Sequence, residues 1–171
     1  MAIIVVGGIS AFFLLSGNNA GEESYPSVGD SITYRASGFV PSKGSFEGPV
    51  EIRITSVSEN SYTFKEIPKG NLSAADQDRG TWKKNEPIAD PQTFGEAEFI
   101  GKENVVTDIG TIETDYYRLE NQTEGGLENK EFYLENETGI TIKVSAESPN
   151  GMRMNMILVS TNIDALKEKF E

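Results

Sequence analysis

The sequence contains no histidine and no cysteine. Their absence excludes Ser-His-Asp and Cys-His nucleophilic catalysis, zinc sites built from these residues, iron–sulfur clusters, redox-active thiols and disulfides. Carboxylates, hydroxyls, lysines and arginines remain, and none of them falls into a spacing diagnostic of a catalytic site. We therefore predict no catalytic residue, no metal site and no cofactor, and we expect that the protein is not an enzyme.

Basic residues are few for a chain of 171 residues. The 15 lysines and arginines face 27 acidic residues, which gives a formal net charge of -12 and an isoelectric point near 4.5. A field of this sign repels the phosphates of nucleic acids and anionic lipid headgroups. We expect no nucleic-acid partner. The length is close to that of one domain.

Charged side chains are missing altogether from the N-terminal segment, where residues 2–17 read AIIVVGGISAFFLLSG. The run is slightly shorter than the ~20 apolar residues of a typical membrane helix, which suits a signal anchor or a signal peptide. The best cleavage position, after Ala20, has Asn18 where a small apolar residue is preferred. We predict a signal anchor at residues 1–17, with a cleaved signal peptide as the alternative. The run is also similar to the hydrophobic head of a type IV pilin.

The flanks of this segment predict its orientation. The first basic side chain is Arg35, and Glu22 and Glu23 follow the apolar run. The amino end is therefore expected in the cytoplasm and the rest of the chain outside it. Residues 18–27 are polar and cannot bury a core, so they predict a flexible tether. Residues 28–171 then form a β-rich extracytoplasmic domain, either on a single-pass protein of the cell membrane or secreted after cleavage.

Alternation of apolar and polar residues dominates this domain and predicts strands. Ser58-Glu59-Asn60 and Asn150-Gly151 are typical of hairpin turns. At the C-terminus, Ile163, Leu166 and Phe170 share one face of a short helix, with Thr161 or Asn162 as its cap. The alternating segments are residues 31–37, 49–57, 61–67, 93–100, 104–108, 111–119, 130–135, 138–145 and 152–160. The predicted fold is mainly β: a curved antiparallel sheet, half-barrel or sandwich-like, with eight or nine strands, the C-terminal helix and the N-terminal membrane helix.

Residues 68–92 interrupt this pattern with three prolines, two glycines and the single tryptophan of the chain, Trp82. Irregular segments of this length are uncommon in compact domains and are often functional. We predict a flap or a mobile insertion here. Trp82 is expected either to contact a ligand or to plug the open end of the sheet.

Residues 110–162 resemble the lipoprotein-carrier (LolA-like) half-barrel. The resemblance rests on an aromatic strand, an acidic turn that ends in Thr138-Gly139, and a second apolar strand. Gly139 supplies the positive φ that closes such a hairpin. The aromatic strands read Thr111 to Tyr117 and Glu131 to Leu134, and the apolar strand reads Ile140 to Lys143. The resemblance implies a curved sheet that holds an acyl chain or another apolar ligand.

Four residues are candidate ligand contacts, and three are candidate glycosylation sites. Met152, Met154 and Met156 form a stripe with Leu158, which is typical of a core and also of an adaptable apolar site. Together with Trp82, these methionines are the predicted ligand-binding residues. Asn-x-Ser/Thr sequons occur in predicted loops or turns. They begin at Asn71, Asn121 and Asn136.

The predicted function is that of a membrane-anchored extracytoplasmic binding module for an apolar or lipid ligand. Its partners would be the membrane, through the N-terminal helix, and an apolar ligand or an envelope protein. One alternative is a structural or assembly component of the cell envelope, including a pilin-like one. A second alternative is a hydrolase in which Glu113 and Asp115, on one strand face, act as a pair of carboxylates.

Overall fold

The computed structural model describes residues 27–59, 61–72, 79–83, 97–123, 125–136 and 139–170. They form nine strands, one 3-10 turn and one short helix. In chain order these are β1 (Ser31–Val40), β2 (Gly44–Val57), β3 (Ser61–Pro68), η3 (Gly70–Leu72), β4 (Arg79–Lys83), β5 (Glu98–Thr107), β6 (Gly110–Thr123), β7 (Gly126–Glu135), β8 (Thr141–Glu147), β9 (Arg153–Thr161) and α2 (Asp164–Lys167). The predicted mainly β class, with its short C-terminal helix, is confirmed.

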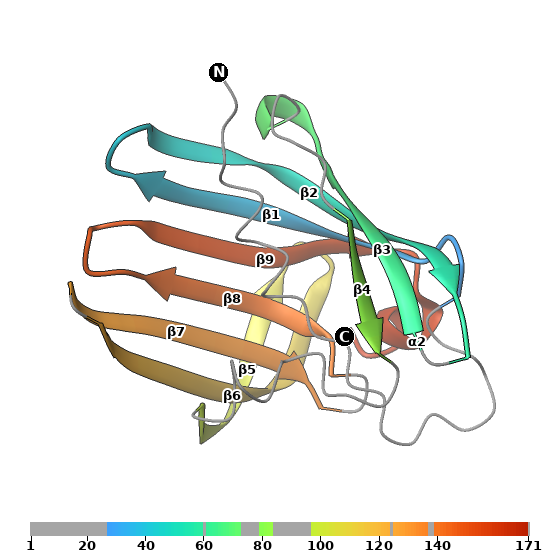
Figure 1. The fold of residues 1–171 in the computed structure, drawn as a ribbon. Helices are drawn as coiled ribbons and strands as arrows, with labels where there is room; N and C mark the ends of the chain where they lie inside the picture. The colour runs from blue at the N-terminus through green and yellow to red at the C-terminus, as the bar shows by residue number, and fades with distance from the viewer. Residues whose placement is uncertain are drawn as a thin grey trace.

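The strands form a single open antiparallel sheet in the order β4-β3-β2-β1-β9-β8-β7-β6-β5 (Figure 1). Of the eight pairs of adjacent strands, seven join strands that are consecutive in the chain. The eighth joins β1 to β9, the first and the last of the described strands. A sandwich would need two sheets, whereas the described strands belong to one. Within the described ranges no helix has the length and hydropathy needed to span a membrane, and the predicted anchor, residues 1–17, lies outside those ranges.

One face of the sheet, here called the core face, carries most of the buried apolar side chains. Strand alternation brings them into register, as in the row Ala36, Met156, Val144 and Phe132, whose members are cross-strand partners in turn. All four are fully buried. Further members are Ile32, Tyr34, Val50, Ile52, Ile54, Phe64 and Leu158. The alternation of apolar and polar residues therefore places the apolar side chains on one buried face, as the sequence predicts.

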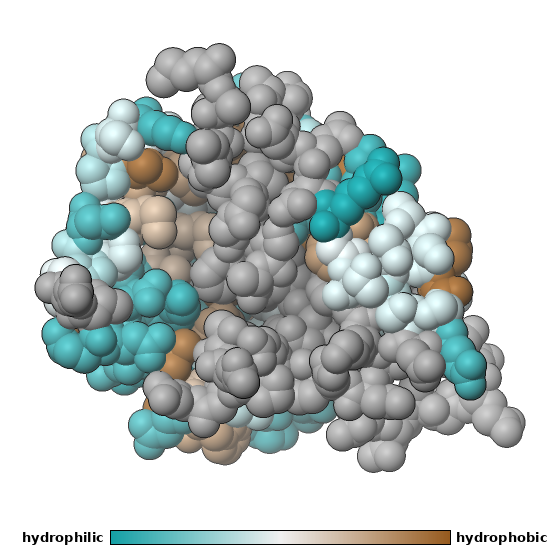
Figure 2. Space-filling model, viewed as in Figure 1, coloured by the Kyte–Doolittle hydropathy of each residue, from teal (hydrophilic) through white to brown (hydrophobic). Residues whose placement is uncertain are grey.

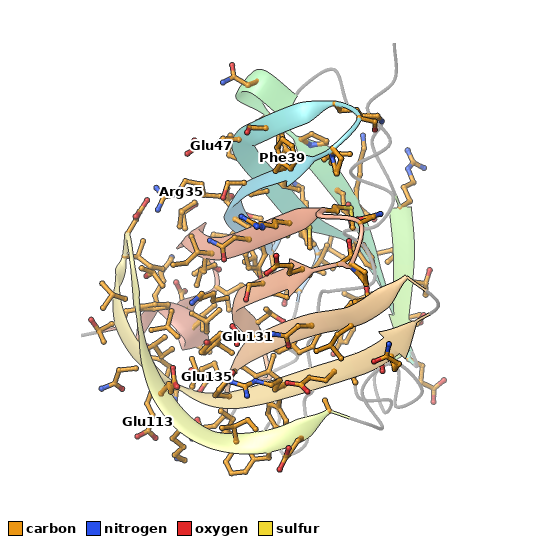
Figure 3. All side chains as sticks on the ribbon, turned by 90° about the vertical axis from the view of Figure 1, so that its left-hand side faces the viewer. Arg35, Phe39, Glu47, Glu113, Glu131 and Glu135 are labelled. Atoms are coloured by element: carbon orange, nitrogen blue, oxygen red, sulfur yellow. The ribbon has the colours of Figure 1, made fainter. Side chains whose placement is uncertain are left out.

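The β5–β6 hairpin bends over the opposite face of the sheet, which is here called the concave face (Figure 3). The tip of this hairpin reaches β1, where Arg35 donates two hydrogen bonds to the Asp108 carboxylate, at 3.0 and 3.1 Å. Inside the curve, Val105, Ile112 and Tyr116 are at most 6% exposed. The hairpin thus gives the concave face its own small apolar layer and leaves the other end of that face open.

Part of the segment predicted to be irregular is a strand, which corrects the prediction for residues 68–92. β3 continues through Pro68, and β4 pairs with β3 from Arg79 to Lys83. Gly80 lies opposite Phe64, whose ring occupies the space that a Cβ of residue 80 would need. Because the apolar contact comes from the neighbouring strand, β4 shows no alternation of its own. Residues 73–78 and 84–92 of this segment lie outside the described ranges.

Two predicted loops are also regular structure. β5 runs continuously through residues 101–103, where a break was predicted, and a register shift against β6 between Phe99 and Gly101 skips Ile100. The polar stretch 120–129, predicted as a loop, instead extends β6 to Thr123 and begins β7 at Gly126. Glutamates and asparagines hide a strand from pattern analysis because an exposed hairpin stem needs no apolar face.

The C-terminal helix is confirmed, but its predicted cap is wrong. Ile163 occupies the N-cap position and makes no side-chain capping hydrogen bond. Asn162 instead accepts a hydrogen bond from Ser31 N and donates one to Gly29 O, and Thr161 donates to Ser31 O. These side chains therefore tie the end of β9 to the start of β1. Leu166 and Ile163 are buried against the sheet, and Phe170 is partly buried with them.

Candidate functional site

A row of polar side chains crosses the open end of the concave face. Because the strands are antiparallel and in register, cross-strand partners on one face form a continuous line. The row runs over seven strands and consists of Glu47, Ser37, Asn155, Ser145, Glu131, Arg118 and Glu98. Neighbouring strands lie about 4.8 Å apart, so the row presents polar groups at that spacing.

The middle of this row lies in a cleft of about 430 Å³. The cleft is formed by four adjacent strands, β1, β9, β8 and β7, at the end where their hairpin turns lie. Its walls are mainly hydroxyls, amides and paired charges, and Gly38, Ala146 and Met154 border it at positions whose side chains alternate to the core face. The remaining lining residues are Ser37, Asn129, Glu131, Ser145, Glu147, Arg153 and Asn155.

Glu131 is the best anchored of these groups, and its label in Figure 3 lies near the middle of the sheet. Tyr116 donates its hydroxyl proton to Glu131 Oε1 at 2.9 Å, and Ser145 donates to Oε2 at 3.1 Å. Arg118 donates to the Tyr116 hydroxyl at 2.8 Å and lies 3.8 Å from Glu131 Oε1. Both carboxylate oxygens therefore have fixed partners, which hold the Glu131 side chain in one orientation.

A pair of stacked tyrosines supports this network from inside the curve. The rings of Tyr116 and Tyr133 lie 4.8 Å apart at 10°, and Lys143 Nζ lies 4.6 Å from the centre of the Tyr133 ring. Burial raises the pKa of Tyr116, and burial and the Glu131 carboxylate raise the pKa of Tyr133 to about 12. Both phenols therefore stay protonated at neutral pH, so Tyr116 keeps donating to Glu131.

The charges in the cleft are balanced. Arg153 donates to Glu147 Oε1 at 3.1 Å, and Arg118 compensates Glu131. Neither carboxylate is left as an isolated charge in the cleft. Within the described residues, no group of three or more carboxylates could hold a metal ion. The site is thus a set of hydrogen-bonding groups without net charge.

The methionine stripe predicted as a ligand contact lies mainly on the core face. Met156 is fully buried on the core face, and Met152 is 40% exposed beside the β8–β9 turn. Met154 borders the cleft, but it lies on the same strand face as Met156, and its half-buried side chain packs against the core. The backbone of Trp82 pairs with Tyr62 at the far edge of the described sheet, three strands beyond β1, and its side chain lies outside what the structure describes.

The carboxylates of the hydrolase alternative do not face this cleft. Glu113 lies on the outer side of the bent β5–β6 hairpin (Figure 3), where Lys102 donates to it at 2.7 Å. Asp115 points to the same side, two residues further along β6. The two therefore sit on a solvent-facing surface of β6, apart from the concave row.

The sequons occupy different environments. Asn71 is exposed in η3, and Asn136 is exposed in the turn after β7. Asn121, expected in a loop, is instead half-buried in β6, where it pairs with Glu128. The first two positions agree with the prediction of loops or turns, and the third corrects it.

Sequence reasoning did not single out Ser37, Asn129, Glu131, Ser145 or Asn155. Each is an ordinary polar residue in an alternating strand, at a position that faces away from the core face. Their convergence depends on the pairing of β1 with β9, which joins segments about one domain length apart. The sequence shows a polar residue at one position in each of the four strands. That these positions are cross-strand neighbours can be recognised only once the register is known.

Comparison with known proteins gives one kind of similarity. No protein-family model matches the sequence, and no curated protein matches it. Among solved structures, a similar chain is a domain from Vibrio parahaemolyticus provisionally described as an outer membrane lipoprotein-sorting protein. It has 7% sequence identity and a TM-score of 0.35, and the match covers 81% of this chain and 87% of that chain.

Proposed function

We propose that this chain is a non-catalytic binding module of the cell envelope that takes its ligand into the cleft of the concave face. The observation that carries the proposal is the cleft itself, in which four strands present hydroxyl, amide and carboxylate groups at the open end of a curved sheet. Concave sites with a few convergent polar groups are the usual place for small ligands. The N-terminal segment would tether the module to the membrane.

The paired charges of the cleft favour binding over catalysis. A general acid or base needs a proton that it can exchange with a substrate. Glu131 is held by Tyr116 and Ser145, and Glu147 by Arg153. These contacts orient the side chains as recognition groups. The module would therefore bind or present a molecule that it leaves chemically unchanged.

The polar walls of the cleft suit a polar or amphipathic ligand better than the lipid expected from the sequence. Gly38, Ala146 and Met154 border the cleft at positions whose side chains alternate to the core face, so polar side chains form its walls. In this proposal the curved sheet acts as a half-barrel, and the ligand lies across β1, β9, β8 and β7. A fully apolar ligand would leave the polar groups of the walls without partners, which costs free energy.

The proposal can be tested by filling the cleft. Asn155 is exposed at its centre, so Asn155→Trp should block ligand entry with little loss of stability. Full-length protein in detergent would be tested by thermal unfolding against a fatty acid, a peptide mixture and a set of oligosaccharides. A ligand at about 100 times its Kd stabilises by about 2.7 kcal/mol. We expect at least one class to raise the Tm of the wild type but not that of the variant.

Asn104→Ala replaces an exposed asparagine on β5 and provides the control. Ligands should raise its Tm as they raise that of the wild type. Equal Tm increases in wild type and Asn155→Trp would place binding elsewhere and contradict the proposal. The absence of any increase would contradict it as well.

A second candidate function, assembly within the envelope, is favoured by β5. This strand forms one edge of the sheet in the described part of the chain and carries three exposed apolar residues, Phe99, Ile100 and Val106. Exposed edge strands are templates for pairing with another chain. Figure 2 shows small apolar areas among the hydrophilic residues of the face that it presents. Wild-type protein that binds none of the tested classes and self-associates on size-exclusion chromatography would favour this function.

A further inference from the structure

We infer that the cleft recognises a neutral polyhydroxyl ligand, that is, an uncharged saccharide. The inference rests on the proposed function and specifies its ligand class. It is carried by three properties of the cleft: unused hydrogen-bonding groups, cancelled charges and an exposed aromatic ring beside the polar row.

The first property is a set of polar groups that still have hydrogen-bonding capacity. In the described part of the chain, the side chains of Ser37 and Asn155 take part in no hydrogen bond, although both line the cleft. Asn129 Oδ1 is buried at the cleft and has no hydrogen-bond partner there. Such an acceptor costs free energy until a donor reaches it. Sugar hydroxyls both donate and accept, so they match a mixed set of hydroxyl and amide groups.

The second property is electrostatic neutrality. The Glu147 carboxylate pairs with Arg153, and the Glu131 carboxylate pairs with Arg118 and accepts from Tyr116. A cationic ligand would find both carboxylates occupied. An anionic ligand would also approach against the field of a chain with a net charge of -12. The uncharged polar ligand is the remaining class.

The third property is the position of Phe39 at the mouth of the cleft. Phe39 lies two residues from Ser37 on the same strand and face, opposite Arg153 of β9. It is 42% exposed, although it is a large apolar side chain (Figure 3). An exposed aromatic face beside hydrogen-bonding groups suits a sugar ring, which has apolar C–H faces and polar edges.

The arrangement of the row also suits a ligand with several rings. The polar groups of Ser37, Asn155, Ser145 and Glu131 repeat from strand to strand at about 4.8 Å. An oligosaccharide lying across the strands would meet a new hydrogen-bonding group at each step. We therefore expect oligosaccharides to bind more tightly than their monosaccharides.

The test uses full-length protein in a detergent without a sugar headgroup. Isothermal titration would measure binding of malto-, cello-, chito- and mannohexaose, with an acidic heparin hexasaccharide and a fatty acid for comparison. We expect at least one neutral hexasaccharide to bind and the heparin fragment not to bind. Ser37→Ala, Asn155→Ala and Phe39→Ala should each weaken binding by about five- to tenfold.

Matched controls are Ser160→Ala on β9 and Asn104→Ala on β5, both exposed and away from the cleft, and they should bind like the wild type. Failure of all four neutral hexasaccharides to bind would overturn the inference, and so would equal affinity of Asn155→Ala and Asn104→Ala. If the fatty acid or a peptide binds and Asn155→Trp blocks it, the saccharide inference fails while the proposed function stands. If no ligand responds to Asn155→Trp, both fail.

Discussion

Glu51 is a buried carboxylate whose charge is stabilised by two cations. Its side chain is 6% exposed, and it forms ion pairs with Arg53 and Lys69, both about half exposed. Burial alone would raise the pKa of Glu51, but the hydrogen bonds from Lys69 and Arg53 outweigh burial and hold it below its ordinary value. Glu51 therefore stabilises the fold in its ionised form.

The pH dependence of stability follows from this shift. The unfolded chain takes up the Glu51 proton at a higher pH than the folded chain, so this contribution is complete above the ordinary carboxyl pKa. It is lost as pH falls through the lowered pKa of the folded state. Lys69→Met should reduce the free energy of unfolding at pH 7 by about 1–2 kcal/mol. Urea unfolding between pH 7 and pH 3 should show this difference shrinking once Glu51 is protonated.

Lys102→Met is the control because the Lys102–Glu113 pair is half exposed on both sides, and solvent screens such pairs. It should change stability little at any pH. A loss for Lys69→Met that stays constant down to pH 3 would show that Lys69 acts through packing and not through the Glu51 charge.

Single glycines show what could be predicted at this scale. Gly139 and Gly151 have φ values of 68° and 80°, and each closes a hairpin that the sequence predicts. Gly80 is different, because its role is to leave room for the ring of Phe64 on the next strand. A turn glycine is identified by its neighbours in the chain, whereas a packing glycine is identified by its neighbour in space.

At the scale of elements, the short helix α2 contributes to stability mainly through one buried side chain. Leu166 is fully buried, and a helix of this length has no stability of its own. Leu166→Ala should lower the free energy of unfolding by about 2–3 kcal/mol, from lost burial and the cavity left behind. Urea unfolding at pH 7 would measure it. Leu127→Ala, at a 52% exposed position in β7, should cost less than about 0.5 kcal/mol. Equal effects would contradict the docking of α2 on the core.

The hairpins were predictable as elements, but their lengths were not. β2–β3 and β8–β9 follow from alternation on both sides of turn residues. The β6–β7 hairpin is longer than predicted because its outer half carries Glu120, Asn121 and Glu128, which give no apolar signal. Backbone pairing continues beyond the core wherever two antiparallel strands already lie side by side.

At the scale of the whole molecule, the predicted signal anchor at residues 1–17 would determine the location of the domain. Val6→Lys combined with Phe13→Lys should abolish membrane association or block export, because a charge near the centre of an inserted helix costs about 2.5–3.5 kcal/mol. Fractionation of cells into membrane and soluble material would detect the change. Val106→Lys, at an exposed position of the domain, should leave the distribution as in the wild type. A double variant that stays in the membrane would contradict the anchor.

The fold class was predictable because alternation is a local property, whereas the cleft was not. Ser145 and Asn155 share a predicted hairpin, so their proximity could be inferred from its turn. Ser37 meets Asn155 only through the pairing of the first strand with the last. On this concave face Asp108 reaches Arg35 from the tip of the β5–β6 hairpin, and local patterns carry no information about such a contact.

The central position of the β1–β9 pair has a consequence for biogenesis. Nascent β1 can pair with β2 as soon as both have been made, but its other edge stays unpaired until β9, the last strand, has been synthesised. Contacts between residues so distant in sequence make folding slow. If the domain is exported as the N-terminal segment predicts, the two halves of the sheet would have unpaired strand edges until β9 has crossed the membrane. A chain truncated before β9 would be left as two unjoined halves, which exposes it to aggregation and proteolysis.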